Sequence, residues 1–487
     1  MTLVALDVNA TRVRVMQGPS REGRMLALEG TATDLPLAVS VEGRYPQPGK
    51  AGAALCRRSP HLSCAGFLPF LGERREWAGP RCKLDAARAL TAVLEVVAAR
   101  AGKHTAAVIA LPGYLVPDQR ALVEKAAEQV RLRLFGTVES ALAVALTAHA
   151  QQPWDGLALV LDIDDHALTW SAIRVQDGTA RVLHGEPQTT LGMRGWKERL
   201  LGVAADACIR RSRRDPRDSP DAEQMLYDQL DGLLLACLER RSGEITVQGA
   251  NWSHAMILSA AELTAACRSL LDRTVNAFHL CHEAAAQYGP LRTVVVSLAA
   301  SRLPGLVPAL ENETHAFTPS LDSDDPAAAQ DEQIPLSVRV MGPDAAAWAA
   351  HCLAAQFQRQ TLPPGHLETA PLLEAQSPAL GLARLQFRGQ DHQMRSANFL
   401  LGRDPRCDLV FDTSEYPSIS AQHCKIVFER QGFTLHDLSR HGTMINDRPV
   451  VEQRELHAGD WIRLGPGGPL LRFLGQTIDN RKLQPTA

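Results

Sequence analysis

Residues 398–446 read NFLLGRDPRCDLVFDTSEYPSISAQHCKIVFERQGFTLHDLSRHGTMIN, and this stretch decides the fold of the C-terminal part of the chain. Runs in which apolar and polar residues alternate, such as NFLLGR and HCKIVFE, are separated by Gly, Pro, Asp or Asn. Short alternating runs between turn residues are typical of an all-β sandwich or barrel. The pattern begins near LARLQF and continues through WIRLG and LLRFL. We therefore predict an all-β domain over residues 382–476, followed by a tail over residues 477–487.

The loops between these runs carry a series of short motifs. Gly402 and Arg403 end one run, Ser420 opens an SAQH motif, a DLSRHGT turn starts at Asp437, and Asn446 follows it. A Gly-Asp pair then precedes WIRLG. In this order the motifs resemble the forkhead-associated (FHA) family, whose pattern is GR, SxxH, a Ser-x-Asn-Gly-Thr-like turn, an Asn and a late Gly-Asp. The resemblance implies a β-sandwich that binds a phosphothreonine-containing protein.

The resemblance also implies roles for individual residues. A phosphothreonine carries nearly two negative charges, and a guanidinium can meet two phosphate oxygens at once. The expected phosphopeptide-binding residues are Arg403, Ser420, Arg440, His441 and Asn446, and the expected structural residues are Gly402, His423, Gly442 and Thr443. The family usually has Asn where this chain has His441, so the fine specificity stays open, and Asn446 is expected to share the peptide-backbone contact. Singly, Arg403 reads as a surface salt bridge and Ser420 as a turn residue; jointly, the motifs favour phosphopeptide binding.

Residues 1–358 show another pattern, in which short apolar runs alternate with long amphipathic segments. The predicted strands are 3–8, 106–112, 157–163 and 293–298, and the predicted helices are 83–102, 117–130, 139–150 and 260–289. Such alternation predicts layers of helices and strands. The Pro-rich segment 359–381 predicts an interdomain linker, and the charged segment 210–224 predicts an exposed loop.

Six stretches of this region resemble the DnaK-type heat-shock chaperones and, more widely, the actin-like ATPase fold. They are LVALDVNATRVRV (3–15), GKAGAALCRRSPHLSCAGFLPFLGERR (49–75), LPGYLVPDQRALVEKAAEQVRLRLFGTVESALAVAL (111–146), LDIDDHALTW (161–170), VVVSLAASRLPGLVPAL (294–310) and MGPDAAAWAAHCLAAQ (341–356). The resemblance spans about residues 1–358 and implies a two-lobed α/β ATPase domain. The peptide-binding β-domain of the chaperones is absent, so client refolding is not expected.

Most nucleotide-binding residues of that family are replaced. Phosphate hairpins need glycines, because backbone N–H groups must approach the phosphates without an intervening Cβ. Asn9 and Ala10 replace Gly-Thr in the first hairpin, Leu298 and Ala299 replace the paired glycines of the adenosine loop, and Leu68 aligns with the catalytic lysine. The residues that remain from the cleft are Asp7, Thr11, Glu139 and Asp162. We expect a domain defective in ATP hydrolysis and no cofactor; ATP with Mg²⁺ is disfavoured.

The second hairpin has three readings. Its glycine run is replaced by Asp164, Asp165 and His166. These residues, with Asp162, are a solvated turn of a pseudo-ATPase, a divalent-cation site, or part of an enzyme with a shifted nucleotide pose. We favour the first, because added carboxylates repel a triphosphate.

Composition narrows the function further. The chain has 487 residues, a net charge of −3, 45% apolar residues and no secretory signal or long apolar run, which fits a soluble protein without nucleic-acid or membrane partners. Its ten cysteines form no CxxC pair and are expected to be free thiols in a reducing cytoplasm. His279, Cys281 and His282 do not share one helix face, so no metal site is expected. GxSxG, P-loop and HExxH motifs are missing.

These observations favour a phosphothreonine-dependent adaptor whose actin-like domain serves as a scaffold. A Ser/Thr kinase that marks the partner is implied. One alternative is an active chaperone-like ATPase whose nucleotide state is coupled to phosphoprotein binding. Another is an oligomerisation module in which the FHA face pairs without phosphate.

Overall fold

The computed structural model describes residues 2–19, 23–102, 106–238, 241–249, 251–316, 336–374, 383–388, 390–394, 398–412, 414–429, 432–457 and 459–474. The chain divides into two units. Unit 1 contains Met1–Ala148 and Trp154–Leu373, and unit 2 contains Glu374–Ala487 with the short piece His149–Pro153. The expected tail over 477–487 and residues 375–381 of the expected linker lie outside the described residues.

Unit 1 holds two large sheets. The strands of the first sheet are, in order across it, β19 (Gly365–Leu367), β11 (Arg133–Glu139), β10 (Ala106–Leu111), β1 (Leu3–Val8), β2 (Arg12–Gly18) and β3 (Arg24–Met25), with β4 (Leu35–Pro36) also paired to β2. The strands of the second are β18 (Ser337–Val340), β17 (Leu291–Val296), β12 (Gly156–Ile163), β13 (Leu168–Gln176), β14 (Thr179–Gln188) and β20 (Thr369–Pro371).

The two sheets have the same arrangement of strands, and each forms the centre of one lobe. An antiparallel hairpin, β1–β2 in the first sheet and β12–β13 in the second, continues into parallel strands on one side. All six residues of β1 are buried. A strand that is covered on both faces needs apolar side chains on both faces, which explains its nearly continuous apolar sequence. The expected two-lobed actin-like fold is confirmed.

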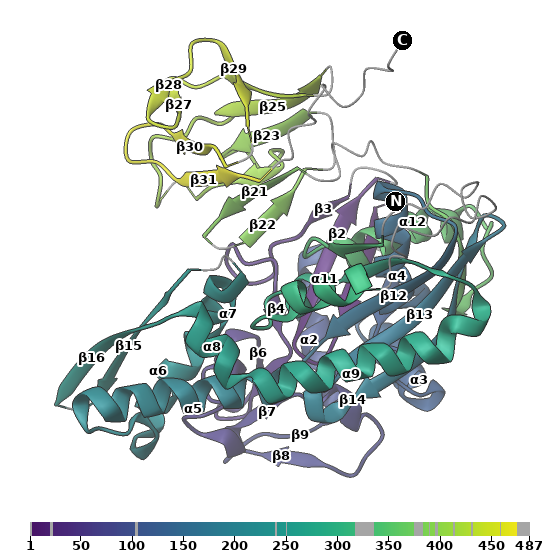
Figure 1. The fold of residues 1–487 in the computed structure, drawn as a ribbon, viewed down its shortest axis with the longest axis horizontal. Coiled ribbons are helices and arrows are strands. Elements are labelled where there is room, and N and C mark those ends of the chain that lie inside the picture. The colour runs from purple at the N-terminus through teal and green to yellow at the C-terminus, as the bar shows by residue number, and fades with distance from the viewer. Residues whose placement is uncertain are drawn as a thin grey trace. The chain divides into compact units, whose positions relative to one another are not determined.

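Helices cover both sheets. They are α1 (Lys50–Ala53), α2 (Ala86–Ala101), α3 (Pro117–Gln129), α4 (Ser140–Gln151), α5 (Met193–Ser212), α6 (Pro220–Asp228), α7 (Leu230–Leu238), α8 (Ala260–Ala266), α9 (Arg268–Ala285), α10 (Leu298–Ser301), α11 (Leu306–Ala316) and α12 (Ala345–Gln358). Helix α12 packs on β1 and β10 of the first sheet, and α9 packs on β13 and β14 of the second (Figure 1). Helix α2 begins where the Asp85 side chain accepts a hydrogen bond from Arg88 N at 2.7 Å.

Smaller elements complete unit 1. They are β5 (Ala38–Ser40), β6 (Gln47–Pro48), β7 (Ser63–Ala65), β8 (Glu76–Ala78), β9 (Lys83–Asp85), β15 (Gly243–Gly249), β16 (Trp252–Leu258) and the 3₁₀ turns η1 (Pro60–Leu62), η2 (Leu68–Phe70), η3 (Thr189–Leu191), η4 (Pro216–Asp218) and η5 (Ala286–Tyr288). The predicted helices and strands are confirmed, with boundaries within a few residues, except that the segment predicted over 260–289 is divided into α8, α9 and η5.

Two sequence expectations differ from the structure. Residues 210–224 do not form a loop: they include the end of α5, the turn η4 and the start of α6, with Pro220 at the first turn of the helix, where proline is tolerated. Strands β19 and β20 lie inside the segment expected to be a linker. They add to the edges of the two sheets of unit 1, so this part of the segment belongs to the lobes.

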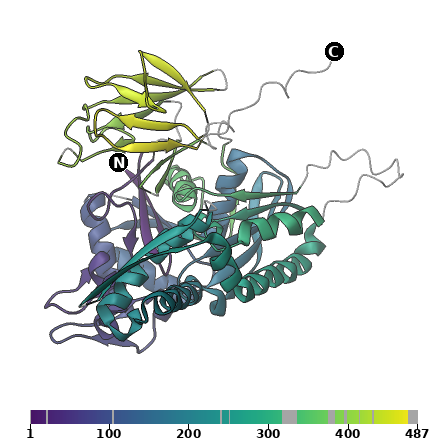
Figure 2. The same ribbon diagram turned by 60° about the vertical axis from the view of Figure 1, so that its left-hand side comes forward.

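Unit 2 is a sandwich of two sheets. One sheet contains β22 (Gln390–Gln393), β21 (Arg384–Phe387), β31 (Leu470–Phe473), β30 (Trp461–Leu464), β27 (Thr443–Ile445) and β28 (Arg448–Pro449). The other contains β24 (Leu409–Val410), β23 (Asn398–Gly402), β25 (Cys424–Glu429), β26 (Gly432–Asp437) and β29 (Gln453–Leu456). Figure 2 shows these strands, in green and yellow, as two stacked layers.

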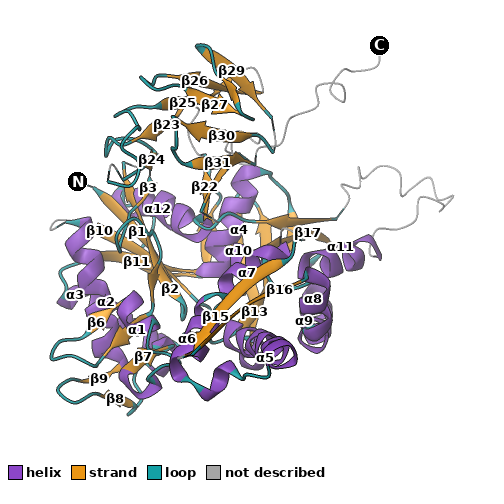
Figure 3. Ribbon diagram, turned by 90° about the vertical axis from the view of Figure 1, so that its left-hand side faces the viewer, coloured by secondary structure: helices purple, strands orange, loops and turns teal. Residues whose placement is uncertain are grey.

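Alternation along the strands builds the core of the sandwich. Ile426, Leu435, Ile462 and Leu471 are fully buried between the layers, whereas their strand neighbours face outward. The described residues between 383 and 474 form strands and loops and no helix (Figure 3). The expected all-β sandwich is confirmed.

Candidate functional site

Three loops meet at one end of the sandwich in unit 2. Arg403 follows β23, Ser420 precedes β25, and Arg440 lies in the loop between β26 and β27. The backbone N–H of Arg403 donates to Ser420 O at 3.2 Å, and that of Arg440 donates to Ser420 Oγ at 3.2 Å. The structure therefore brings together three of the five residues expected at the phosphopeptide, and His441 lies next to Arg440.

The buried His423 ring joins these loops from below. Its Nδ1 accepts a hydrogen bond from Ser420 N at 3.2 Å, and its Nε2 lies 3.3 Å from Gly442 O. Because one nitrogen accepts and the other faces a carbonyl, the ring is neutral with its proton on Nε2. Burial lowers the pKa of His423, which keeps it in that form.

Two glycines are required by geometry. Gly442 has φ +79°, a conformation that L side chains rarely adopt. At Gly402 an added Cβ would lie 2.2 Å from Ala421 O, so the strand can approach the neighbouring loop only without a side chain. Both glycines therefore fix the loops that carry the arginines.

Asp437 organises the loop that carries Arg440. Its carboxylate accepts hydrogen bonds from Ser439 N at 3.0 Å, from Thr443 N at 3.2 Å and from Thr443 Oγ1 at 2.9 Å. Sequence reasoning assigned Thr443 a structural role but gave Asp437 none. The signal was an Asp followed two residues later by Ser, the pattern of an Asx turn.

The positive charges of this site have no counter-ion among the described residues. Asp404, the acid next to Arg403, is held by Arg406, whose Nη2 lies 2.7 Å from Asp404 Oδ2. Hydrogen bonds from Arg406 hold the pKa of Asp404 at about 2. Arg403, Arg440 and His441 are exposed, and no described residue accepts a hydrogen bond from their side chains. A cluster of this kind can bind a doubly charged anion.

Asn446 does not join the site. It lies with Asp447 in the two-residue turn between β27 and β28, and both residues have positive φ. Its Nδ2 donates to Asp460 Oδ1 at 2.7 Å, and its Oδ1 accepts from Trp461 N at 2.9 Å. Both polar atoms of the amide thus have partners within the domain, which gives Asn446 a role in the turn, and its contact to a peptide stays a prediction.

The second place of interest is the cleft between the lobes of unit 1. Here the turn of the β1–β2 hairpin meets the turn of the β12–β13 hairpin. The backbone N–H of Ala10 donates to Asp164 Oδ2 at 2.9 Å, and the Thr11 hydroxyl donates to Asp165 Oδ1 at 3.1 Å. Asp165 N donates to Thr11 Oγ1 at 2.9 Å. The two hairpins are therefore bridged by their own residues.

The Asp164 carboxylate is the centre of this bridge. Besides Ala10 N, it accepts the hydroxyl of Tyr114 at 2.6 Å and the backbone N–H groups of His166 and Ala167 at 2.9 Å each. Burial raises the pKa of Asp164, and the Tyr114 and backbone hydrogen bonds oppose that shift. The expectation of a solvated turn is wrong, because Asp164 is only 5% exposed and is turned into the cleft.

Arg12 supplies the positive charge of the cleft. Its Nη1 lies 2.8 Å from Asp7 Oδ2, and its Nε lies 3.6 Å from Asp34 Oδ2. Burial alone lowers the pKa of Arg12, and the charges of Asp7 and Asp34 more than offset this, so the pKa is raised. Burial raises the pKa of nearby Asp162. Asp7, one of the retained acids, thus has an arginine as its counter-ion.

Little space remains in the cleft. A cavity of about 20 Å³ is lined by Pro112, Gly113, Tyr114, Ser140, Ala141, Asp162, Ile163, Asp164, Ala167, Thr169 and Ser171. This volume holds about one water molecule, whereas ligand pockets usually measure about 300–1,000 Å³.

Glu139, another of the retained acids, is only 7% exposed. Its burial raises the pKa of its carboxyl to about 7, and the negative charge of Glu368 contributes to the same shift.

Comparison with protein families agrees with this geometry. A family model described as Hsp70 protein matches residues 84–330, just over half of the chain. The chain belongs to the Hsp70 family. A second model, described as FHA domain, matches residues 399–465. FHA domains generally bind phosphothreonine-containing proteins, so the chain combines an Hsp70 domain with a phosphoprotein-binding adaptor domain. No curated protein matches the chain.

The lobes of the Hsp70 domain are also joined at the rim of the cleft. Gln224 of α6 accepts a hydrogen bond from Arg57 N at 2.7 Å and donates to Ala53 O at 3.2 Å. The Arg57 guanidinium pairs with Glu198 and lies 4.5 Å from the centre of the Tyr227 ring. Sequence reasoning missed this contact, because it read the segment that ends at Gln224 as a loop.

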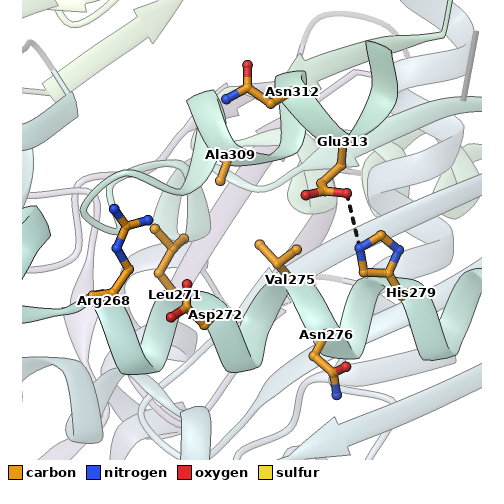
Figure 4. Close-up of a pocket in the computed structure, with 9 residues that line it drawn as sticks. All are labelled: Arg268, Leu271, Asp272, Val275, Asn276, His279, Ala309, Asn312 and Glu313. Atoms are coloured by element: carbon orange, nitrogen blue, oxygen red, sulfur yellow. Dashed lines mark ion pairs between the residues drawn. The ribbon is translucent and has the colours of Figure 1, made fainter. Parts of the chain in front are cut away.

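Another hollow of the Hsp70 domain lies between α9 and α11. It measures about 400 Å³ and is lined by Arg268, Leu271, Asp272, Val275, Asn276, His279, Ala309, Asn312 and Glu313 (Figure 4). His279 Nε2 lies 3.1 Å from Glu313 Oε2, across the two helices. Cys281 is turned into the core and His282 stacks on Phe278, so His279, Cys281 and His282 do not converge.

Among the described residues, no helix is long and apolar enough to cross a bilayer.

Proposed function

We propose that this protein is an adaptor that captures a phosphothreonine-containing segment of a partner with its FHA loops. The observation that carries the proposal is that the backbone N–H groups of Arg403 and Arg440 both donate to Ser420, while both side chains are exposed and neither guanidinium is paired to a described acid. A Ser/Thr kinase that phosphorylates the partner is part of the proposal. Arg403 and Arg440 bind phosphate oxygens, Ser420 donates its hydroxyl, and His441 contacts the peptide beside the phosphate.

Energetics support an interaction of moderate strength. Each charge-assisted hydrogen bond contributes about 1.5–3 kcal/mol, so three of them, after the ordering of a peptide, give a dissociation constant in the micromolar range. The loops are held by His423 and Asp437 before a ligand arrives, which lowers the entropy lost on binding.

In the same proposal the Hsp70 domain is a scaffold that does not hydrolyse ATP. Asp164 takes hydrogen bonds from backbone N–H groups of the kind that a phosphate would take, and Arg12 lies where the retained acids would otherwise face a cation. The cavity of about 20 Å³ beside Asp162 and Asp164 is much smaller than a usual ligand pocket, which supports this part of the proposal.

Binding of a degenerate phosphothreonine peptide library to the full chain, followed by fluorescence polarisation, tests the adaptor role. We expect micromolar binding that Arg403→Ala weakens by about tenfold or more and that unphosphorylated peptides lack. Arg448→Ala is the matched control, because Arg448 is an exposed arginine of the same domain in strand β28, outside the three loops of the site. A well-folded protein that binds no phosphothreonine peptide would contradict the proposal.

A further inference from the structure

One face of the sandwich in unit 2 presents apolar and cationic side chains together. It is the outward side of strands β27, β30 and β31, whereas Arg403 and Ser420 adjoin strands of the other sheet. We propose that this face, the tryptophan–arginine face, binds an extended acidic segment of a partner protein that needs no phosphate. The segment carries carboxylates at two positions, i and i+2. This inference goes beyond the proposed function and uses none of its residues.

Large apolar side chains lie exposed on this face. Trp461 of β30 and Leu470 of β31 are 45% and 43% exposed. The residues next to them, Ile462 and Leu471, are fully buried in the core. Alternation along each strand therefore turns Trp461 and Leu470 outward. Met444 of β27 lies beside them and is half-buried. Single exposed apolar residues are ordinary, but three on neighbouring strands are typical of an interaction site.

Two arginines complete the tryptophan–arginine face. Strand pairing places Arg472 opposite Trp461, and Arg463 opposite Leu470. The Arg472 guanidinium lies 5.6 Å from the centre of the Trp461 ring. The two arginines are therefore diagonal neighbours, and diagonal positions in an antiparallel pair lie about 7–8 Å apart. Cationic and apolar side chains alternate at the four corners of this part of the sheet.

The two guanidinium groups are incompletely paired. Arg463 Nη2 lies 3.2 Å from Asp447 Oδ1, in an ion pair whose side chains are 41% and 83% exposed. No described acid forms an ion pair with Arg472, because Asp391, the other acid on this face, is held by Arg384 at 3.3 Å. The Nε atoms of Arg463 and Arg472 are buried and have no hydrogen-bond partner among the described residues. An unpaired donor costs free energy, so a carboxylate that draws each guanidinium outward gains the missing hydrogen bonds.

The chemistry of the partner follows from this arrangement. A guanidinium binds a carboxylate through two parallel hydrogen bonds. In an extended segment the side chains at i and i+2 point to the same side and lie about 6.6 Å apart, which is close to the spacing of Arg463 and Arg472. Apolar residues of the same segment can pack against Trp461 and Leu470. The partner is therefore an extended segment with the pattern acid-x-acid.

The size of the face favours a short segment over a second copy of the chain. Strands β21, β31 and β30 have four residues each and β27 has three. At about 3.3 Å per residue and 4.8 Å per strand, the face measures about 13 by 19 Å. A stable interface buries about 800 Å² on each partner, which is about three times this area. Asp391 and Asp447 on the face also disfavour a nucleic-acid backbone, because its charges are evenly spaced along the strand.

An arrayed library of unphosphorylated 12-residue peptides tests the proposal. Half of its members have Asp or Glu at positions 6 and 8, the other half have Asn or Gln there, and the remaining positions are mixed. Labelled full chain is applied to the array, and the best members are titrated by fluorescence polarisation. We expect the binders to be acidic members with micromolar dissociation constants. Binding should weaken about fivefold or more in Arg472→Gln and in Trp461→Ala.

Controls separate this face from the phosphothreonine-binding loops. Arg454→Gln changes an arginine of β29, in the other sheet, and should bind the acidic peptides like the parent. Arg403→Ala should lose phosphothreonine peptides and keep the acidic ones, and Arg472→Gln should do the reverse. Thermal unfolding of each variant shows that it is folded. If Trp461→Ala does not fold, Arg472→Gln decides the matter, because it keeps the length of the side chain and removes only the charge.

Three outcomes would overturn the inference. One is a folded chain that binds acidic members no more tightly than their amide counterparts, and another is equal binding by the parent and Arg472→Gln. The third is a different occupant of the same face. In that case the parent sediments as a dimer that Trp461→Ala separates, or it binds a 12-nucleotide single-stranded DNA more tightly than any acidic peptide. None of these results touches the phosphothreonine-binding role, which the phosphopeptide library tests separately.

Discussion

At the scale of single residues, Asp164 shows how an acid can take the place of a ligand. Its carboxylate accepts one hydroxyl and three backbone N–H groups, and it is almost completely buried. A carboxylate and a phosphate are both anions with several acceptor oxygens, so the same hairpin geometry suits either. The Asp164 carboxylate is therefore an anionic group within the cleft that the chain itself supplies.

Removal of this carboxylate should destabilise the Hsp70 domain. Asp164→Ala leaves four donors without an acceptor in a buried place, so we expect a loss of about 2–4 kcal/mol in the free energy of unfolding. Urea unfolding followed by tryptophan fluorescence measures it, because six of the seven tryptophans precede residue 359. The control Asp155→Ala changes an exposed acid and should stay within about 0.5 kcal/mol of the parent protein. Equal stabilities of the two variants would show that the hairpin bridge contributes nothing.

Glu139 should make stability depend on pH. The pKa of this carboxyl is raised from 4.5 to about 7, so the folded state binds a proton that the unfolded state has lost between these values. Stability therefore falls as pH rises from 4.5 to 7, by at most about 1.4 kcal/mol per pH unit. Glu139→Gln should be more stable than the parent at pH 8 and equal to it near pH 4.5.

Unfolding midpoints in urea across this pH range measure the effect. The control Glu244→Gln changes an exposed acid of β15 and should keep the pH profile of the parent. A Glu139→Gln profile parallel to that of the parent would mean that the carboxyl stays ionised when folded.

The sequence predicted which residues belong to the FHA site, but it did not predict all the hydrogen bonds that individual side chains make. Arg403, Ser420 and Arg440 were found because the motifs occur in a family order, and the structure places them together. The inward turn of Asp164 could not be predicted, because a turn rich in acids is usually solvated and two of its partners, Ala10 and Tyr114, lie 154 and 50 residues away in sequence. The role of Asn446 in its turn could not be predicted for a similar reason, since its partners Asp460 and Trp461 lie 14 and 15 residues further along the chain.

At the scale of elements, the loop between β26 and β27 is set by one side chain. Asp437 holds both ends of the turn that carries Arg440 and His441. Asp437→Ala should weaken phosphothreonine-peptide binding by about tenfold, because the loop has to be ordered on binding. Asp437→Asn keeps one acceptor oxygen and should lie between the variant and the parent.

Binding and hydrogen exchange together check this prediction. Exchange of the loop amides should rise in Asp437→Ala, while β25 and β30 stay protected because the core is unchanged. Loss of protection across the whole sandwich would instead mean that Asp437 supports folding and not the loop alone.

Long periodic elements could be predicted and short edge elements could not. Helices α2 and α3 and strands β1 and β12 were found because their apolar patterns are long and regular. Strands β19 and β20 have three residues each in a Pro-rich stretch, and they exist because the sheets of unit 1 offer edges to pair with. Helix α6 was hidden by charged and proline residues that are now seen at its start and in the turn before it.

At the scale of the whole molecule, the two lobes of the Hsp70 domain are joined without a nucleotide. The hairpins meet through Asp164 and Thr11, and the rim is closed by Gln224 and Arg57. In a nucleotide-dependent domain the ligand itself would link the lobes. Here side chains provide links of their own between the lobes.

Thermal unfolding of the full chain with and without Mg²⁺–ATP tests this view. A site with a dissociation constant near 1 µM would gain about 4 kcal/mol from 1 mM ATP, which raises the melting temperature by about 5 °C in a domain of this size. We expect a shift below about 1 °C, because the cavity at the cleft holds about one water molecule. Gln224→Ala serves as a control, since it should lower the melting temperature by loosening the rim and still give no response to ATP. A clear ATP-dependent shift in the parent would mean that the lobes open and that Asp164 yields its donors to phosphate; capture of phosphothreonine would then be coupled to a nucleotide state.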